Sequence, residues 1–409
     1  MTKIFVVAVA AIAMLSQCGL LVDQTARLWT DSVEIAVYVE EYNALDHGFR
    51  VELEFLENPP RELGIRTDTP DLVIAEQLAS RTIRPLLGDL TQFVSEEMSA
   101  ELYADALELG RSVDGVFAIP LSFNLPMVVF YRDSGLVDAE RFAVTPDELR
   151  QIGGSFNDSI GERFVRMGFS PRWETQFLTV MAMLRGAEFR ETAPHQVAWN
   201  QAAMVDTVTE LRAWLTETNG GVNAVEAFEA TYLYDPSLKL LETGRIGAVF
   251  AASDEFYEIP ESRRSGFSFA WLWDGEVIPV LGSIRYAAVP AEAANTRAAE
   301  HFLSWLFDPD VQRELIRAAP EKRVRSFGFA GGVSTIPEVN LTGLSFRYRS
   351  LLGAVPQADR LSFPSVLPTY WRELSEDVIE PWMSRAAAAE EAPSDLLELV
   401  NAWLLTRGE

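Results

Sequence analysis

Several aromatic residues in this chain stand beside polar ones, at positions where strands are expected to end or helices to begin. The apolar face of a sugar ring stacks on an indole or phenol ring, while carboxylate, amide and hydroxyl groups bind the hydroxyls that burial would leave unpaired. The pattern therefore indicates carbohydrate binding, although each tryptophan taken singly also suits a packing role in the core. The candidate binding residues are Trp29, Glu76, Gln77, Asn124, Trp173, Ser253, Asp254, Trp271, Tyr370 and Trp371.

The short motifs of several enzyme classes are missing from the sequence. It contains no Gly-x-x-x-x-Gly-Lys-Ser/Thr, no Gly-x-Gly-x-x-Gly, no His-Glu-x-x-His and no Gly-x-Ser-x-Gly. The 60 acidic residues leave room for a pair of carboxylates of the glycosidase type, whose separation the sequence does not reveal. His47, His195 and His301 lack metal-ligand spacing. We expect no metal, no cofactor and no enzymatic activity.

The length and the net charge of the chain limit its possible domain organisation and binding partners. A chain of 409 residues is too long for one compact core and suits two domains, and its 48% hydrophobic content argues against disorder. A net charge of −26 argues against binding to nucleic acid or to an anionic membrane surface, since both require clustered Lys and Arg. We expect a monomer whose ligand is a small molecule.

The N-terminus has the features of an export signal. Lys3 precedes an apolar run at residues 4–15 that is too short to span a bilayer comfortably. Cys18, the single cysteine, follows at once, and its setting resembles a bacterial lipobox, in which this residue would be lipidated. We expect a signal peptide at residues 1–17 and a tether at 18–25. The alternative is an ordinary signal peptide with an incidental Cys18.

The elements that position the first candidates alternate strands with helices. Residues 26–30 are predicted as a strand, and a helix follows to about residue 45. Apolar and polar residues alternate from Phe49 to Phe55, the pattern of a strand with one wet face. Residues 71–75 form a short buried strand that ends at Glu76 and Gln77. This order predicts an α/β fold, in which ligands bind beyond the carboxyl ends of strands.

A connector between two short apolar runs positions Asn124. Residues 116–119 and 127–131 are predicted as buried strands, and the prolines in residues 120–126 argue against helix or central strand between them. Such a connector passes from one sheet to another and would place Asn124 between two lobes. The alternative is a loop within a single large α/β domain. A second extended passage at residues 267–273 and a glycine-rich break near residue 331 favour two lobes.

Taken together, these features resemble a bacterial extracellular solute-binding protein of the sugar-binding ABC-transporter type, a family 1-like lipoprotein. The resemblance covers essentially the whole mature chain. It rests on the N-terminal segment with Cys18, on residues 71–75, 115–131 and 282–290, on the run Ala-Ala-Glu-His-Phe-Leu-Ser-Trp-Leu at 298–306 with Asp-Pro-Asp-Val-Gln at 308–312, and on Thr-Tyr-Trp at 369–371.

The resemblance implies a periplasmic-binding-protein-like fold, in which each of two lobes is a mixed sheet flanked by helices and a hinge joins them. Residues 26–121 and 274–330 would form one lobe, and residues 125–270 and 332–409 the other. Hinge crossings would lie near residues 121–125, 270–274 and 330–332. Asn124 would stand at the hinge, where the family commonly carries an acid. Trp29, Glu76 and Gln77 would line the first lobe, and Trp173, Ser253, Asp254, Tyr370 and Trp371 the second.

The resemblance also implies a transport role. A solute would enter the open cleft and shift the hinge equilibrium toward closure, and an ABC transporter permease would recognise the closed form. The protein would be exported to the periplasm or the outer face of the cytoplasmic membrane and anchored there through a lipid on Cys18. Two other functions stay open: an exported lipoprotein of the same fold that has lost transport, and a carbohydrate-active enzyme.

Overall fold

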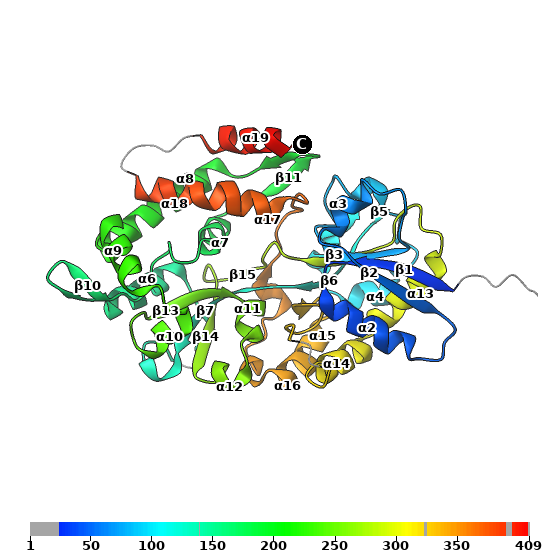
Figure 1. Ribbon diagram of the computed structural model, residues 1–409, viewed down its shortest axis with the longest axis horizontal. Helices are drawn as coiled ribbons and strands as arrows, with labels where there is room; N and C mark the ends of the chain where they lie inside the picture. The colour runs from blue at the N-terminus through cyan, green and yellow to red at the C-terminus, as the bar shows by residue number, and fades with distance from the viewer. Residues whose placement is uncertain (1–23, 139, 323–324, 390–394, 408–409) are drawn as a thin grey trace, which may run out of the picture.

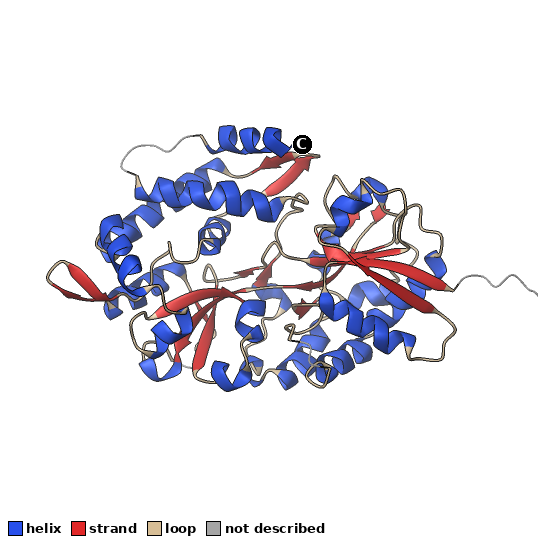
Figure 2. Ribbon diagram, viewed as in Figure 1, coloured by secondary structure: helices blue, strands red, loops and turns tan. Residues whose placement is uncertain are grey.

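The protein is described by a computed structural model that covers residues 24–138, 140–322, 325–389 and 395–407. Two β-sheets lie side by side, and helices surround both of them (Figures 1 and 2). The predicted α/β class is therefore confirmed. Cys18 and the expected signal peptide lie outside the described residues. Within the described residues, no helix has the length and apolar character needed to cross a membrane.

The first sheet consists of six strands: β1 (Thr25–Thr30), β2 (Arg50–Phe55), β3 (Leu72–Glu76), β6 (Ile119–Phe123), β16 (Arg285–Ala288) and β17 (Val333–Ser334). In space they follow the order β17-β6-β16-β3-β1-β2. β1 runs parallel to β2 and β3, whereas β16 is antiparallel to β3 and β6. The sheet is therefore mixed, as the resemblance implied.

Three helices cover one face of this sheet: α2 (Val33–Asn43), α13 (Thr296–Leu306) and α14 (Pro309–Ala318). Their apolar residues recur at helical spacing and pack in one cluster with Leu28 of β1 and Ile74 of β3. Asp308 begins α14 by accepting hydrogen bonds from the N–H groups of Asp310 and Val311, and Pro309 occupies the first helical position. This packing fixes the end of β1 and the start of α2.

The second sheet has four strands: β7 (Pro126–Tyr131), β8 (Ala143–Val144), β13 (Ala248–Ala252) and β14 (Phe267–Leu272), in the order β13-β7-β14-β8. Around it lie α6 (Pro146–Phe156), α7 (Gln176–Leu184), α8 (Gln201–Ala213), α10 (Ser237–Glu242), α11 (Ser253–Glu258), α18 (Glu380–Ala388) and α19 (Leu396–Arg407) (Figure 1). α6 begins at a capping box that Thr145 and Glu148 form.

Short elements complete the described fold. The strands are β4 (Arg111–Ser112), β5 (Gly115–Val116), β9 (Asp158–Ile160), β10 (Arg163–Arg166), β11 (Arg190–Ala193), β12 (Gln196–Ala198), β15 (Ile278–Pro279) and β18 (Leu361–Ser362). The helices are α3 (Pro59–Leu63), α4 (Glu96–Glu101), α5 (Ala104–Leu109), α9 (Val222–Tyr232), α12 (Glu261–Arg264), α15 (Pro337–Val339), α16 (Ser345–Arg347) and α17 (Trp371–Leu374).

The prediction for residues 120–126 is wrong. β6 includes Pro120 and lies between β17 and β16, so most of the predicted connector is a central strand. Pro120 is tolerated because the pairing with β16 is irregular there: Tyr286 faces Pro120, whereas Arg285 faces Ser122. Pro126 is the first residue of β7. Only Asn124 and Leu125 therefore connect the two sheets at this point.

Two further passages between the sheets differ from the predicted positions. The chain leaves β14 at Leu272 and enters β16 at Arg285, so this passage is longer than the expected 270–274 and includes β15, which pairs with β18. Val333 pairs with Phe123 of β6, so the chain leaves the first sheet beyond the expected 330–332. The assignment of every residue to one lobe or the other stays a prediction.

Candidate functional site

Asn124 is held by hydrogen bonds to three separate segments of the chain. Its side-chain amide donates to the carbonyl oxygen of Gly331 at 3.0 Å, and its side-chain oxygen accepts a bond from the Ser253 hydroxyl at 2.7 Å. Its backbone oxygen accepts from the N–H of Leu281 at 2.9 Å. Asn124 is 6% exposed, so these bonds form in a dry environment. The structure thus places Asn124 and Ser253, two predicted site residues, in one buried cluster.

Ser253 completes this cluster from the second sheet. It is fully buried at the start of α11, and its oxygen accepts a hydrogen bond from the N–H of Leu125 at 3.1 Å. Gly331 has a φ of +81°, a backbone conformation that favours glycine. A Cβ at Gly331 would also lie only 3.0 Å from Oε1 of Glu34. Glycine at position 331 therefore allows its segment to approach Asn124 and the start of α2 closely at the junction of the two sheets.

A cavity of about 650 Å³ opens beside Asn124, between the two sheets. Asp31 and Ser32 contribute from the turn between β1 and α2, Glu34 from the first turn of α2, and Glu76 from the end of β3. The second sheet contributes the carboxylates of α11, Asp254 and Glu258. Its size is typical of small-molecule sites, and its lining is strongly charged.

Ion pairs fix the charged residues on the first-sheet side of this cavity. Arg285 pairs with Asp31 and lies 3.8 Å from Glu76. Glu76 also pairs, at 3.0 Å, with Arg372 of α17. Because Glu76 follows the first sheet and α17 packs with the helices of the second, this pair spans the space between the sheets. Arg285 therefore orients the acids at the ends of β1 and β3, and Arg372 connects them to the other side.

A smaller cavity of about 280 Å³ lies next to the first, because Gly282 lines one and Ser283 the other. Trp371, Phe189 and Phe363 give this smaller cavity an aromatic lining, and the rings of Phe189 and Trp371 are 5.0 Å apart. The Gln77 side chain donates to the carbonyl oxygen of Gly282 at 2.8 Å, so it fixes the segment that separates the cavities. The predicted residues Gln77 and Trp371 thus meet at this segment.

A second contact between the two sides forms at Glu191 of β11. Its carboxylate accepts hydrogen bonds from the N–H of Arg81, at 2.5 Å, and from the hydroxyl of Thr82, at 3.1 Å. Burial raises the pKa of Glu191. Arg81 and Thr82 follow β3, whereas β11 belongs with the helices around the second sheet (Figure 1). Together with Glu76 and Arg372, this contact holds the two sides close in the structure.

Four predicted aromatic residues do not line either of these cavities. Trp29 and Trp271 are each 1% exposed in the core, and their indole N–H groups donate to Glu54 and to the carbonyl oxygen of Ala354. Trp173 stacks on Phe228 with the ring centroids 5.9 Å apart. Tyr370 is buried; its ring stacks with that of His195 and is tilted against that of Trp403. These four rings pack against the protein itself.

The sequence reasoning missed Asp31, Glu34 and Arg285 of the larger cavity. One signal was available for the first of them, since Asp31 directly follows the first predicted strand in the same way as Glu76 follows the predicted strand at residues 71–75. No local pattern marks Glu34, which lies in the first turn of a helix, or Arg285, which begins a strand. Their role depends on which segments the fold brings to the cavity.

Carboxylates on the second-sheet side have unusual acidity. Burial, together with the nearby charges of Glu255 and Glu258, raises the pKa of Asp254 to about 7. Burial and the charges of Glu34 and Glu255 also raise the pKa of Glu258. Asp254 Oδ1 is buried without a hydrogen-bond partner. The α11 side of the cavity therefore has acids whose ionised forms lack compensation from the protein.

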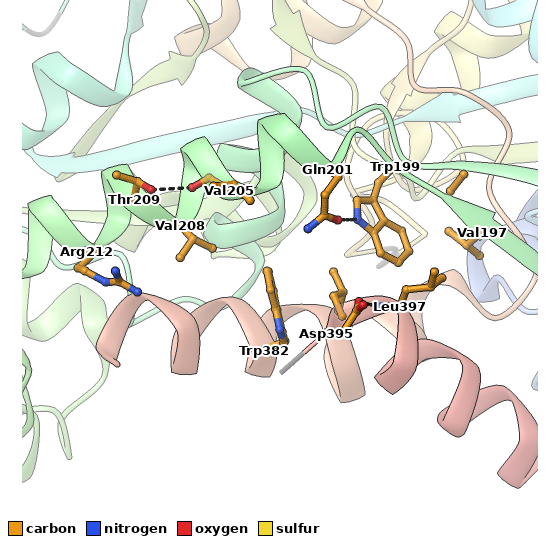
Figure 3. A pocket seen from close by; sticks show the side chains of 12 residues that line it. Val197, Trp199, Gln201, Val205, Val208, Thr209, Arg212, Trp382, Asp395 and Leu397 are labelled. Carbon is orange, nitrogen blue, oxygen red and sulfur yellow. Dashed lines mark hydrogen bonds between the residues drawn. The ribbon is translucent and has the colours of Figure 1, made fainter. Parts of the chain in front are cut away.

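A further groove, of about 830 Å³, lies elsewhere, between α8 and the C-terminal helices α18 and α19 (Figure 3). Val205, Val208 and Trp382 give it a mainly apolar lining, and Trp199 donates to the side chain of Gln201 at 2.8 Å. All its lining residues belong to elements around the second sheet. Movement of one sheet relative to the other would not enclose a ligand in this groove. We therefore do not take the groove as the candidate site.

The chain is similar to known solute-binding proteins. The family model described as "Bacterial extracellular solute-binding protein" matches residues 39–320. A search of curated proteins finds no match. Among solved structures, a cyclo/maltodextrin-binding protein complexed with maltotetraose superposes with a TM-score of 0.65 at 15% identity, covering 94% of this chain and 97% of that chain.

Two further structures are similar over nearly their full length. The cyclic alpha-maltosyl-1,6-maltose binding protein from Arthrobacter globiformis gives a TM-score of 0.64 at 18% identity, covering 93% of this chain and 99% of that chain. An ABC substrate-binding protein from Listeria monocytogenes, in complex with cycloalternan, gives 0.62 at 14% identity, covering 94% and 99%. At these identities the likeness establishes the fold, and the predicted two-lobed architecture is confirmed.

Replacement of Asn124 by Ala should destabilise the protein. The change leaves the Gly331 carbonyl oxygen and the Ser253 hydroxyl buried without their partner, which costs about 1–3 kcal/mol. Urea denaturation followed by circular dichroism measures this difference in the free energy of unfolding. The matched control is Asn223→Ala at an exposed position of α9. Equal stability of the two variants would show that the cluster does not hold the sheets together.

The raised pKa of Asp254 should make stability depend on pH. Between about pH 4 and pH 7 the folded protein keeps a proton on Asp254 that the unfolded chain has released, so the free energy of unfolding falls as pH rises through this range. Asp254→Asn removes this effect and should be more stable than the parent by at least about 1 kcal/mol at pH 8 but not at pH 4.

Thermal denaturation at both pH values tests this prediction. Asp206→Asn, at an exposed position of α8, is the control and should follow the parent. Parallel pH dependence of Asp254→Asn and the parent would contradict the prediction.

Proposed function

The chain belongs to the bacterial extracellular solute-binding proteins, and from this premise we propose that it captures a sugar or oligosaccharide between its lobes and delivers it to an ABC transporter permease. One observation carries the proposal: a polar cavity of about 650 Å³ adjoins an aromatic cavity of about 280 Å³ at the junction of the two sheets. Polar groups suit the sugar hydroxyls, and the indole of Trp371 suits the apolar face of a ring.

The proposed binding residues are those that the two cavities share with the predictions. Glu76, Asp254 and Asn124 line the larger cavity, and Trp371 lines the smaller one. We assign Gln77 and Ser253 a positioning role, since their side chains donate hydrogen bonds to Gly282 and to Asn124. Sugars bound by the similar solved structures, maltotetraose among them, support the same class of solute.

Closure of the lobes around the solute is the proposed mechanism. The short link at Asn124 and Leu125 and the longer passage that contains β15 would act as the hinge. A solute favours the closed form only through contacts that it makes with both lobes at once. Glu76 with Arg372 and Glu191 with Arg81 are protein contacts that such closure would form. A permease would then bind the closed form.

Export and membrane anchoring complete the proposal. Membership of an extracellular family agrees with an exported protein, and a lipid on Cys18 would keep it at the membrane. Two alternatives have their own tests: a scaffold that has lost transport would bind no small solute, and an enzyme would turn over a glycan. The family favours binding over catalysis.

A thermal-shift screen of the mature protein against sugars and polyols tests the function. A bound solute at a hundred times its dissociation constant should add roughly 2.7 kcal/mol to stability. Trp371→Ala should weaken binding of the identified sugar at least tenfold, whereas Trp305→Ala, on the outer helix α13, should not. If no sugar or polyol in the screen raised the melting temperature, the proposed sugar-binding function would be contradicted.

Small-angle X-ray scattering tests the mechanism separately. The radius of gyration should decrease when the identified sugar is added to saturation, because the lobes approach each other. Arg372→Ala removes the ion pair with Glu76 and should make the solute-free protein more open than the parent. An unchanged radius of gyration at saturation would count against closure even if the sugar binds.

A further inference from the structure

We propose that the solute carries a positive charge, as a protonated amine on a sugar, and that Glu34, Asp254 and Glu258 bind this amine in the larger cavity. This inference rests on the proposed function and names the class of sugar. It follows from the charges that line the cavity and from the partners that each charge has within the described residues.

The carboxylates of the cavity fall into two groups. Asp31 and Glu76 are compensated by Arg285, and Glu76 also by Arg372. Glu34, Asp254 and Glu258 line the same cavity, and within the described part of the chain none of the three forms an ion pair. An excess of negative charge is therefore concentrated where α2 faces α11.

The remaining cations do not balance this second group. Lys322 lines the cavity but pairs with Glu41 at 2.5 Å, outside the group. Arg325 lines the cavity as an exposed side chain and contributes one charge against three carboxylates. Binding of a neutral sugar would bury these negative charges away from water without compensating them, and the desolvation of the carboxylates would cost a substantial free energy. A protonated amine would compensate it and donate hydrogen bonds to the same oxygens.

Glu34 and Ser32 give independent support, because both are buried polar groups that face the cavity without a partner. Glu34 is 6% exposed, and among the described residues no hydrogen bond or ion pair reaches its carboxylate. Ser32 is 4% exposed, and its hydroxyl has no hydrogen-bond partner even though the residue precedes α2, where serine usually caps the helix. Buried polar groups in folded proteins are almost always bonded. A solute with an amine and hydroxyls would satisfy both.

The two cavities together fit a solute with unlike ends. The larger cavity is lined by charged, hydroxyl, amide and aliphatic groups, with no aromatic ring among its described lining residues. The aromatic lining is confined to the smaller cavity at Trp371, Phe189 and Phe363. A sugar ring against Trp371 would leave its charged substituent, or a second amino sugar unit, in the larger cavity.

Protonation equilibria agree with this geometry. Asp254 lies near the charges of Glu255 and Glu258 on α11, Glu258 lies near Glu34 on α2, and Glu174 before α7 lies near Glu255. Arg285, Lys322 and Arg325 are the cations that line the same cavity beside these acids. Burial and Glu255 raise the pKa of Glu174 to about 7. A bound cation would lower the pKa values of these acids, so binding of the amine should release protons.

Isothermal titration calorimetry with matched sugars tests the inference. The probes are glucosamine and its β-1,4-linked dimer, compared with glucose and cellobiose and with the neutral N-acetyl forms, at about pH 6.5, where the amine is protonated. We expect the amino sugars to bind at least tenfold more tightly than the neutral sugars. Glu34→Gln should remove this preference, whereas Glu40→Gln, at an exposed position of the same helix, should keep it.

The outcomes separate the inference from the proposed function. Equal or tighter binding of the neutral sugars would contradict the inference that the solute is positively charged. It would leave the proposed sugar-binding function unaffected. Failure of every sugar in the calorimeter and in the thermal-shift screen would overturn both. Glu34→Gln removes a buried charge that forms no ion pair among the described residues, so the solute-free variant should melt at the same temperature as the parent or higher. A lost preference would then not reflect unfolding. Glu258→Gln provides a second test and should also weaken the preference.

Discussion

The structure depends on the bonds that surround Asn124. One short link joins a strand in the middle of the first sheet to a strand in the middle of the second, and a single side chain bonds Gly331 on one side and Ser253 on the other. Because these polar groups are buried, each must keep its partner, so the segments that meet here are held in one arrangement. The position of the cavity follows, since its residues lie at the ends of elements that start or finish at this junction.

Charge is the second organising feature of the site. Arg285 draws Asp31 and Glu76 together, and Arg372 extends this network across the space between the sheets. The acids on α11 and at the start of α2 have no equivalent cation in the described residues. Such an arrangement is costly without a ligand and favourable with a cationic one. Selectivity would then come from the charges that the protein leaves uncompensated as much as from the groups that touch the sugar ring.

The aromatic residues illustrate the limits of local patterns. A tryptophan beside a polar residue at a strand end predicted a sugar platform, but Trp29 and Trp271 are core residues whose indole N–H groups already have partners. Trp371 has the same local signature and lines a cavity. The two situations differ only in what packs over the ring, and that depends on segments far away in the sequence. Polar residues after strands were a better guide, because the geometry of the sheet brings strand ends together.

By itself, the sequence determined the α/β class and the strands that end near Glu76 and Asp254, because hydrophobic periodicity, caps and strand ends are local properties. The two-lobed family followed from the resemblance of the whole chain. The tertiary structure decided that Pro120 lies in a central strand, since an irregular register with β16 accommodates its missing N–H. It also decided which carboxylates have a cation nearby. Glu34 and Glu76 look alike in the sequence. Only the packing of distant segments pairs Glu76 with Arg285 and Arg372, whereas Glu34 lies near Arg285 but forms no ion pair among the described residues.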